Sequence, residues 1–249
     1  MELLAHDLHH MLEHRPGRVV SEEVAMMIWE QIIKGLQHVH FCGIVHRDMH
    51  SANVLIHHSA PSQTTLQAEQ VHLVKLADFG KATTLKANAP DGAPVYTART
   101  AALSAIAPEV LFCNGTVWAA THKRSAHSQL DQYVISHAPQ VCSYSEKIDV
   151  WASGILLIYM AKGRPYEGRS APEIAREMIE LFGKVPRAVA RKYGWSVPAD
   201  WQVPPEGGLS APSQSRCNPK LSFEIGSLLW QEKVDRALKV FAYDPAARP

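Results

Sequence analysis

The sequence predicts an α+β fold that is mainly helical and carries one small β-hairpin. Three observations lead to this prediction. Apolar residues recur at helical spacing within residues 21–40, residues 148–160 are almost wholly apolar, and two short apolar runs flank the polar stretch 57–70. A spacing of three or four residues gathers side chains on one helix face, whereas short runs bounded by turn residues are typical of paired strands. A length of 249 residues allows one large domain or two small ones.

The composition excludes several classes of protein. The chain is 46% hydrophobic and 20% charged, with a net charge of +1, so no basic excess indicates nucleic-acid binding. No apolar stretch reaches the roughly 20 residues of a membrane span, and the first residues do not have the pattern of a secretory signal. The four cysteines are widely separated, which indicates reduced thiols in an intracellular protein of the cytoplasm or nucleus: Cys42, Cys113, Cys142 and Cys217.

The first half of the chain predicts two helical segments and the hairpin. Residues 1–14 read as a short segment that enters a helix. Ser21 is a good N-cap for a helix that extends to His40, because acidic residues follow it and the helix has one apolar stripe: Val24, Ile28, Ile32, Leu36 and Val39. A loop follows, then strands at residues 54–56 and 71–77.

The second half is predicted to alternate irregular segments with helices. Residues 81–108 and 113–146 have little periodicity, so we expect a surface loop and then an insertion. Residues 148–160 predict a helix buried on all sides, and residues 171–182 an amphipathic one. An extended loop is expected at residues 194–220, before a final helix at 228–241.

Five short motifs occur in an order that chance does not readily produce. They are VHRDMHSANVL at 45–55, ADFG at 77–80, APE at 107–109, DVWASG at 149–154, and the arginine of DPAARP at 248. Each is weak alone, but together they resemble the C-terminal lobe of a eukaryotic protein kinase over nearly the whole chain. Residues 180–194, ELFGKVPRAVARKYG, are similar to the group of cyclin-dependent, MAP and SR-protein kinases.

Residues of the HRD and DFG motifs carry the chemistry that this resemblance implies. Phosphoryl transfer needs a carboxylate that orients the attacking hydroxyl, and Asp48 is the candidate. Asn53 and Asp78 offer the hard oxygen ligands that Mg²⁺ prefers. Taken singly, an aspartate in a loop is more often a turn or cap residue, and the order of the motifs favours the catalytic interpretation.

Other positions receive regulatory or structural roles from the resemblance. Arg47 is expected to pair with a phosphorylated residue of the loop 81–106, with a solvated arginine as the alternative. The nearest phosphorylation candidates are Thr97, Thr100 and Ser104. Asp149 is expected to hydrogen-bond the backbone of the HRD turn, and Glu109 to form a buried ion pair with Arg248. His46 and Phe79 are expected to be packing residues.

The first eight residues, MELLAHDL, are similar to the linker between the two kinase lobes. By this resemblance the backbone of Glu2 and Leu4 would hydrogen-bond adenine, and Asp7 would approach the ribose. Leu55 would form the floor beneath the base. The alternative is an ordinary amphipathic helix start.

The sequence departs from the family pattern in four places. No Gly-rich loop, strand lysine or partner glutamate is found, so we expect a partial kinase domain over residues 1–249 in which the N-terminal lobe is absent. His50 stands where the catalytic loop usually has lysine, and a neutral imidazole supplies no permanent charge. Ala102 and Ala105 replace a threonine and an aromatic residue. The 39 residues between Glu109 and Asp149 form an unusually long insertion.

These observations leave two main hypotheses. One is the catalytic domain of a serine/threonine kinase that uses ATP and Mg²⁺ to phosphorylate a protein substrate, with catalytic residues Arg47, Asp48, His50 and Asn53. The other is a pseudokinase or regulatory lobe that binds a protein partner, which His50 and the two alanines favour. A degenerate product without a stable fold is a third, weaker alternative.

Overall fold

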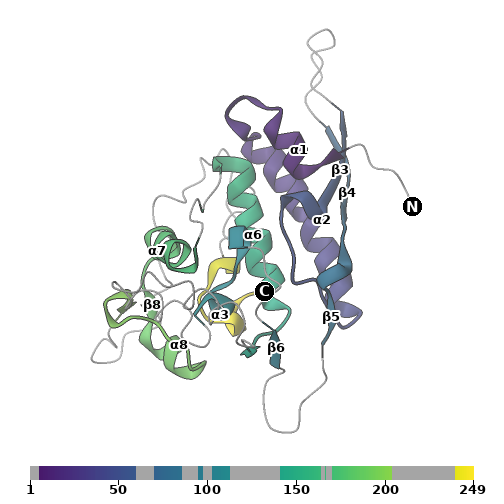
Figure 1. The fold of residues 1–249 in the computed structure, drawn as a ribbon. Coiled ribbons are helices and arrows are strands. Elements are labelled where there is room, and N and C mark those ends of the chain that lie inside the picture. Colours follow the sequence, from purple (N-terminus) through teal and green to yellow (C-terminus); the bar gives the residue numbers. More distant parts are fainter. Residues whose placement is uncertain are drawn as a thin grey trace, which may run out of the picture.

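The computed structural model describes residues 6–59, 70–85, 95–97, 103–112, 141–163, 166, 170–203 and 239–249. Two long helices, α2 (Glu22–Phe41) and α6 (Lys147–Lys162), lie side by side at its centre (Figure 1). A β-hairpin packs against α2, and the smaller helices α7 (Ala171–Phe182) and α8 (Arg187–Lys192) lie on the other side of α6. The loop of residues 46–53 follows a strand that contacts α2, and its backbone is hydrogen-bonded to Asp149 of α6.

Helix α2 begins one residue after the predicted N-cap. The Oγ atom of Ser21 accepts a hydrogen bond from the backbone N–H of Val24 at 3.3 Å, which satisfies one of the free donors of the first turn. Four of the five residues of the predicted apolar stripe are buried, and Val39 is half-buried. The sequence prediction of this helix is confirmed.

Helix α6 is enclosed by protein on all sides, as predicted. Every residue from Ile148 to Ala161 is buried. A helix with no polar face is stable only in the centre of a domain, where its whole surface is removed from water. This burial makes α6 the rigid element from which residues of the catalytic region can be held.

Gly154 marks the closest approach of α6 to the C-terminal segment. A Cβ atom built there would lie 2.7 Å from Cζ of Phe241 and also too close to Val240. We expect Gly154→Ala to lower the free energy of unfolding by about 1–3 kcal/mol, as overpacking does in other cores. Urea unfolding measures this loss, and adding Val240→Ala should reduce it by opening space. An equal cost in both backgrounds would show that the close approach is not responsible.

The predicted hairpin forms and gains a third strand. Strands β3 (Val54–Ser59) and β4 (Gln70–Leu76) pair antiparallel, and β1 (His6–Asp7) pairs with the outer edge of β3. Helix α1 (Leu8–Glu13) follows β1 directly, so the expectation of a segment that enters a helix is confirmed. The two-residue strand β1 was not predicted, because so short a run has no periodicity of its own.

Three segments that we expected to be irregular, residues 44–53, 81–108 and 113–146, contain short paired strands. Strand β2 (Ile44–Val45) pairs with β5 (Thr83–Thr84), and β6 (Val95–Thr97) pairs with β7 (Val141–Ser143). The prediction of uninterrupted loops at 81–108 and 113–146 was therefore wrong at these strands. Pairing between residues tens of positions apart leaves no local signal in the sequence. Residues 60–69, 86–94, 98–102 and 113–140 of the predicted loops lie outside the described residues.

The remaining elements surround the far side of α6. They are α3 (Pro108–Leu111), the predicted amphipathic helix α7 (Ala171–Phe182), α8 (Arg187–Lys192), and the parallel pair β8 (Val185–Pro186) and β9 (Gln202–Val203). Ser170 and Glu173 form a capping box at the start of α7. Of the predicted helix 228–241, residues 228–238 lie outside the described residues and Lys239–Phe241 is a 3₁₀ turn. Residues 204–220 of the predicted loop also lie outside.

The C-terminal segment is fixed by polar contacts at its end. Burial raises the pKa of Tyr243, whose hydroxyl donates to the carbonyl of Gly183 at 2.7 Å. Burial alone would raise the pKa of Asp244, but hydrogen bonds from Tyr193, Lys192 and Ala246 outweigh it and lower that pKa.

None of the helices in the described ranges combines the length and apolar character that a membrane span requires.

Candidate active site

One buried carboxylate from α6 holds the catalytic loop. Asp149 is 1% exposed, and its oxygens accept the backbone N–H groups of His46 at 2.8 Å and Arg47 at 2.9 Å. The Nε2 atom of His40, near the end of α2, donates to the same carboxylate at 2.9 Å. Arg47 has a φ angle of 67°, which is costly for a residue with a side chain and persists where surrounding contacts fix it. The predicted role of Asp149 is confirmed.

His46 joins the loop to the end of β4. Its Nε2 atom contacts the carbonyl of Ala77 at 2.9 Å, and its Nδ1 atom accepts the backbone N–H of Asp48 at 3.3 Å. Because a carbonyl only accepts, Nε2 carries the proton and the ring is neutral. The ring also packs against Phe79, with centroids 4.7 Å apart. His46 is therefore a packing residue, as expected, and not a proton carrier.

Asp48 and Asn53 are joined by direct hydrogen bonds and are 4% and 6% exposed. The Nδ2 atom of Asn53 lies 2.9 Å from the carbonyl of Asp48, 3.1 Å from Nε2 of His50 and 3.4 Å from Oδ2 of Asp48. An amide nitrogen has two protons, so the two shorter contacts take them. All these bonds use Nδ2, so in the described part of the chain Oδ1 of Asn53 is left to accept another group.

His50 lies beside the carboxylate without adding charge to it. Its Nε2 atom is 3.7 Å from Oδ2 of Asp48. Since Nδ2 of Asn53 can only donate, Nε2 of His50 must accept, and the imidazole is neutral in this arrangement. The structure therefore agrees with the expectation that His50 does not replace the charge of a lysine.

Lys81 reaches the carboxylate of Asp48 from the segment that follows β4, and the sequence did not predict this contact. Its Nζ atom lies 2.9 Å from Oδ1 of Asp48. Its carbonyl accepts a hydrogen bond from Nε of Arg47 at 2.6 Å. The two residues that form the ion pair are 33 positions apart, so no spacing rule links them.

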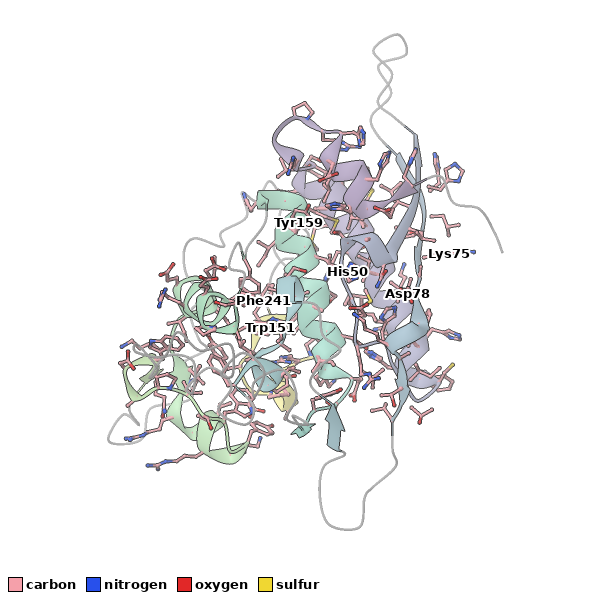
Figure 2. The ribbon with its side chains drawn as sticks, viewed as in Figure 1. His50, Lys75, Asp78, Trp151, Tyr159 and Phe241 are labelled. Carbon is pink, nitrogen blue, oxygen red and sulfur yellow. The ribbon has the colours of Figure 1, made fainter. Side chains whose placement is uncertain are left out.

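Asp78 is placed next to Asn53 through the backbone. The N–H of Ala77 donates to the carbonyl of Asn53 at 2.9 Å. Asp78 follows Ala77 directly, so its backbone lies close to that of Asn53. Asp78 has a left-handed backbone, and its exposed carboxylate accepts the N–H of Gly80 at 3.0 Å. Figure 2 shows His50 and Asp78 in the same part of the view, between α6 and the hairpin. The described residues contain no cluster of three or more His, Cys, Asp or Glu that could hold a metal ion by themselves.

The residues expected at the nucleotide are only partly described. Glu2 and Leu4 lie outside the described residues. Asp7 caps α1, since its Oδ1 atom accepts the N–H of His10 at 2.7 Å, and it pairs with half-buried Leu55 across β1 and β3. The sheet thus brings Asp7 and Leu55 together, and their contacts with ribose and adenine stay predictions.

Comparison with known families agrees with this arrangement. Residues 1–206 match the family model described as "Protein kinase domain". The chain belongs to the protein kinase domain family. Because this match begins at residue 1, it does not support the expectation that the N-terminal lobe is absent, and that expectation stays a prediction.

Curated relatives of this kinase chain are distant in sequence. It is 26% identical over 192 residues to "Meiosis induction protein kinase IME2/SME1" of Saccharomyces cerevisiae, covering 74% of the chain and 24% of the relative. It is 25% identical to "Mitogen-activated protein kinase hog1" of Blastobotrys adeninivorans, covering 78% and 36%. It is 28% identical to "Probable serine/threonine-protein kinase iksA" of Dictyostelium discoideum, covering 63% and 14%. The chain therefore spans well under half the length of each of these relatives.

The kinase arginine of the HRD motif is already engaged. Besides the carbonyl of Lys81, Arg47 contacts the hydroxyl of buried Tyr144, with NH1 at 3.4 Å. Pairing of Arg47 with a phosphorylated residue stays a prediction. Of its candidate partners, Thr97 lies in β6, Ser104 is exposed, and Thr100 lies outside the described residues.

The buried ion pair expected between the APE segment and the chain's last residues is present. Arg248 donates through NH1 and NH2 to the two carboxylate oxygens of Glu109 at 2.6 and 2.9 Å, and both side chains are almost fully buried. The guanidinium also lies over the ring of Trp151, 5.0 Å from its centroid.

Of the two alanine positions, Ala105 is buried and lines a cavity of about 10 Å³, whereas Ala102 lies outside the described residues.

Proposed function

We propose that this chain is the catalytic part of a serine/threonine protein kinase, which transfers the γ-phosphate of ATP to a hydroxyl of a protein substrate with Mg²⁺. One observation carries the proposal. Asp48 and Asn53 form one buried hydrogen-bonded unit, and the strand end that bears Asp78 is bonded to the same unit through Ala77. Phosphoryl transfer by kinases uses a base and two metal-binding oxygens in such proximity.

The oxygen atoms at this site suit magnesium. Asn53 offers its amide oxygen, and Asp78 offers an exposed carboxylate that is not paired with a cation among the described residues. Mg²⁺ is held by one or two carboxylates together with substrate phosphates, so a set of only two protein ligands fits it. When bound, the ion neutralises charge on the phosphates.

Asp48 is suited to act on the attacking hydroxyl. Its backbone N–H donates to Nδ1 of His46, its carbonyl accepts from Nδ2 of Asn53, and its side chain is held by Lys81. A carboxylate in this fixed position orients the hydroxyl and accepts its proton. The described residues would then form the lobe that carries the catalytic loop, in agreement with the resemblance to the C-terminal lobe.

Serine and threonine are proposed as targets because of the relatives. One of them bears the words serine/threonine-protein kinase in its name, and another is named as a MAP kinase. The loop HRDMHSAN itself is typical of neither serine/threonine nor tyrosine kinases. Phosphoamino-acid analysis of a labelled substrate decides the point, with phosphoserine and phosphothreonine as the expected products.

A regulatory lobe without efficient transfer is the second candidate. The observation that favours it is the neutral state of His50. The loop therefore has no positive charge at the position where the family usually has a lysine. In that case the natural protein would bind a partner and transfer no phosphate above the level of an Asp48→Asn variant.

The metal role of Asp78 gives the test of the nucleotide site. At Mg·ATP concentrations of about 100 times Kd, binding should add about 2.7 kcal/mol. For a domain of this size that raises the Tm by about 5–10 °C. Asp78→Asn should abolish most of this shift, because the neutral amide binds Mg²⁺ weakly.

Asp200 provides the matched control, because it is an exposed aspartate in a distant 3₁₀ turn. Asp200→Asn should keep the full thermal shift with Mg·ATP. An unchanged shift in the Asp78→Asn variant would contradict the metal role, and no shift in the unaltered natural protein would contradict nucleotide binding itself.

A further inference from the structure

We propose that Lys81 supplies the positive charge of the transfer step, and that its ammonium contacts the transferred phosphate while it holds Asp48. This inference rests on the proposed function, because it assigns a role in the same reaction. It places the charge on the segment after β4 instead of on the catalytic loop, where the sequence has His50.

The first argument is the position of the ammonium. The Nζ atom of Lys81 lies 2.9 Å from Oδ1 of Asp48, whereas Asn53 and His50 lie on the side of Oδ2. The two carboxylate oxygens therefore have different neighbours. A substrate hydroxyl that binds Asp48 must lie beside this carboxylate, and the phosphorus that it attacks lies next to that hydroxyl. An ammonium beside Oδ1 is therefore close to the hydroxyl and to the phosphoryl oxygens.

The second argument is that the neighbouring imidazole is unavailable for this role. Nε2 of His50 accepts a hydrogen bond from Nδ2 of Asn53, so the imidazole carries no charge in this arrangement. A lysine ammonium has three donors, and one of them is sufficient for Asp48.

The third argument is that Lys81 is anchored at one end and accessible at the other. Its carbonyl accepts the Nε hydrogen of Arg47 at 2.6 Å, and it ends the 3₁₀ turn Phe79–Lys81. Its side chain is nevertheless 47% exposed, against 5% for Asp48. The backbone is thus tied to the catalytic loop, while the ammonium is open to an incoming phosphate.

The reaction balances without further reagents. The hydroxyl oxygen of the substrate forms a bond to the γ-phosphorus, and the bond from that phosphorus to the β–γ bridging oxygen breaks, which releases ADP. The hydroxyl proton passes to Asp48. Lys81 keeps its protons and stabilises the charge on the phosphoryl oxygens, as preorganised donors do in other enzymes.

Lys81→Met in the natural protein tests the proposal. We expect kcat to fall about 10²–10³-fold with a smaller change in KM for the protein substrate, because a donor aimed at transition-state charge is lost. Lys81→Met/His50→Lys should recover at least about tenfold of that loss, since the second lysine places charge on the other side of Asp48. Unchanged kcat in Lys81→Met, or a loss that His50→Lys leaves unaltered, would overturn the proposal.

Lys34 is the control, because it is an exposed lysine of α2 and makes none of the contacts described for the site. Lys34→Met should leave kcat unchanged. A second measurement separates this inference from the proposed function. Mg·ATP should raise the Tm more than Mg·ADP does, and Lys81→Met should remove that difference.

If the Tm difference persists in Lys81→Met, the inference fails and the kinase proposal stands. If neither nucleotide raises the Tm and no phosphate is transferred, the kinase proposal fails and the inference fails with it.

Discussion

Asp48→Asn should lower the kcat of phosphate transfer by about 10²–10⁴-fold, the range of a positioned general base. Asparagine has the same size but accepts no proton, so the substrate hydroxyl loses its acceptor. The buried carboxylate is also the group on which Lys81, Asn53 and the neighbouring imidazole converge. Each factor of ten corresponds to about 1.4 kcal/mol of transition-state stabilisation, so the expected loss is about 3–5 kcal/mol.

Incorporation of labelled phosphate into myelin basic protein measures the effect of Asp48→Asn. Circular dichroism should show that the variant is folded, since the substitution keeps the size of the side chain and removes one ion pair, with half-exposed Lys81. Asp200→Asn provides the matched change at a surface site. Undiminished transfer by the Asp48→Asn variant would remove Asp48 from the mechanism.

Arg248→Met should lower the free energy of unfolding by about 3–5 kcal/mol, the cost of leaving one partner of a buried ion pair uncompensated. Glu109 would remain charged and 2% exposed. The carbonyls of Ala242 and Lys147 would lose donors at 2.8 and 3.0 Å, and Trp151 would lose its cation. For a domain of about 250 residues the Tm should fall by about 6–20 °C.

A double variant separates charge from packing at this ion pair. Adding Glu109→Leu to Arg248→Met should recover part of the loss, because both buried charges are then removed. Lys162→Ala breaks the half-exposed pair with Glu22 and should cost no more than about 1 kcal/mol. If breaking the buried pair and breaking the half-exposed pair lower the free energy of unfolding by the same amount, burial does not increase the contribution of the Arg248–Glu109 pair to stability.

Long elements of the fold could be predicted because their signal is local. The stripe of α2, the cap at Ser21 and the apolar run of α6 each lie within one segment of the chain. The two-residue strand β1 and the strand pairs β2–β5 and β6–β7 could not be predicted. Their stability comes from partners tens of residues away, and two or three residues have no measurable periodicity.

The candidate site shows the same division between family motifs and long-range contacts. The contact of Asp149 with the HRD backbone and the pair of Glu109 with Arg248 followed from the resemblance, not from spacing. Lys81 was missed because the family motif assigns no charge to the residue after DFG. Its contact becomes visible only when the end of β4 is folded against the catalytic loop.

The position of Asp149 in the most enclosed helix has a consequence for motion. The amide protons of His46 and Arg47 are bonded to a carboxylate that is buried at the start of α6, beneath the core of the domain. Exchange of these protons with solvent therefore requires opening of the core, at a cost close to that of unfolding the domain. Fluctuations during turnover must then arise in the half-exposed side chain of Lys81 and its neighbours, while the loop beneath them stays fixed.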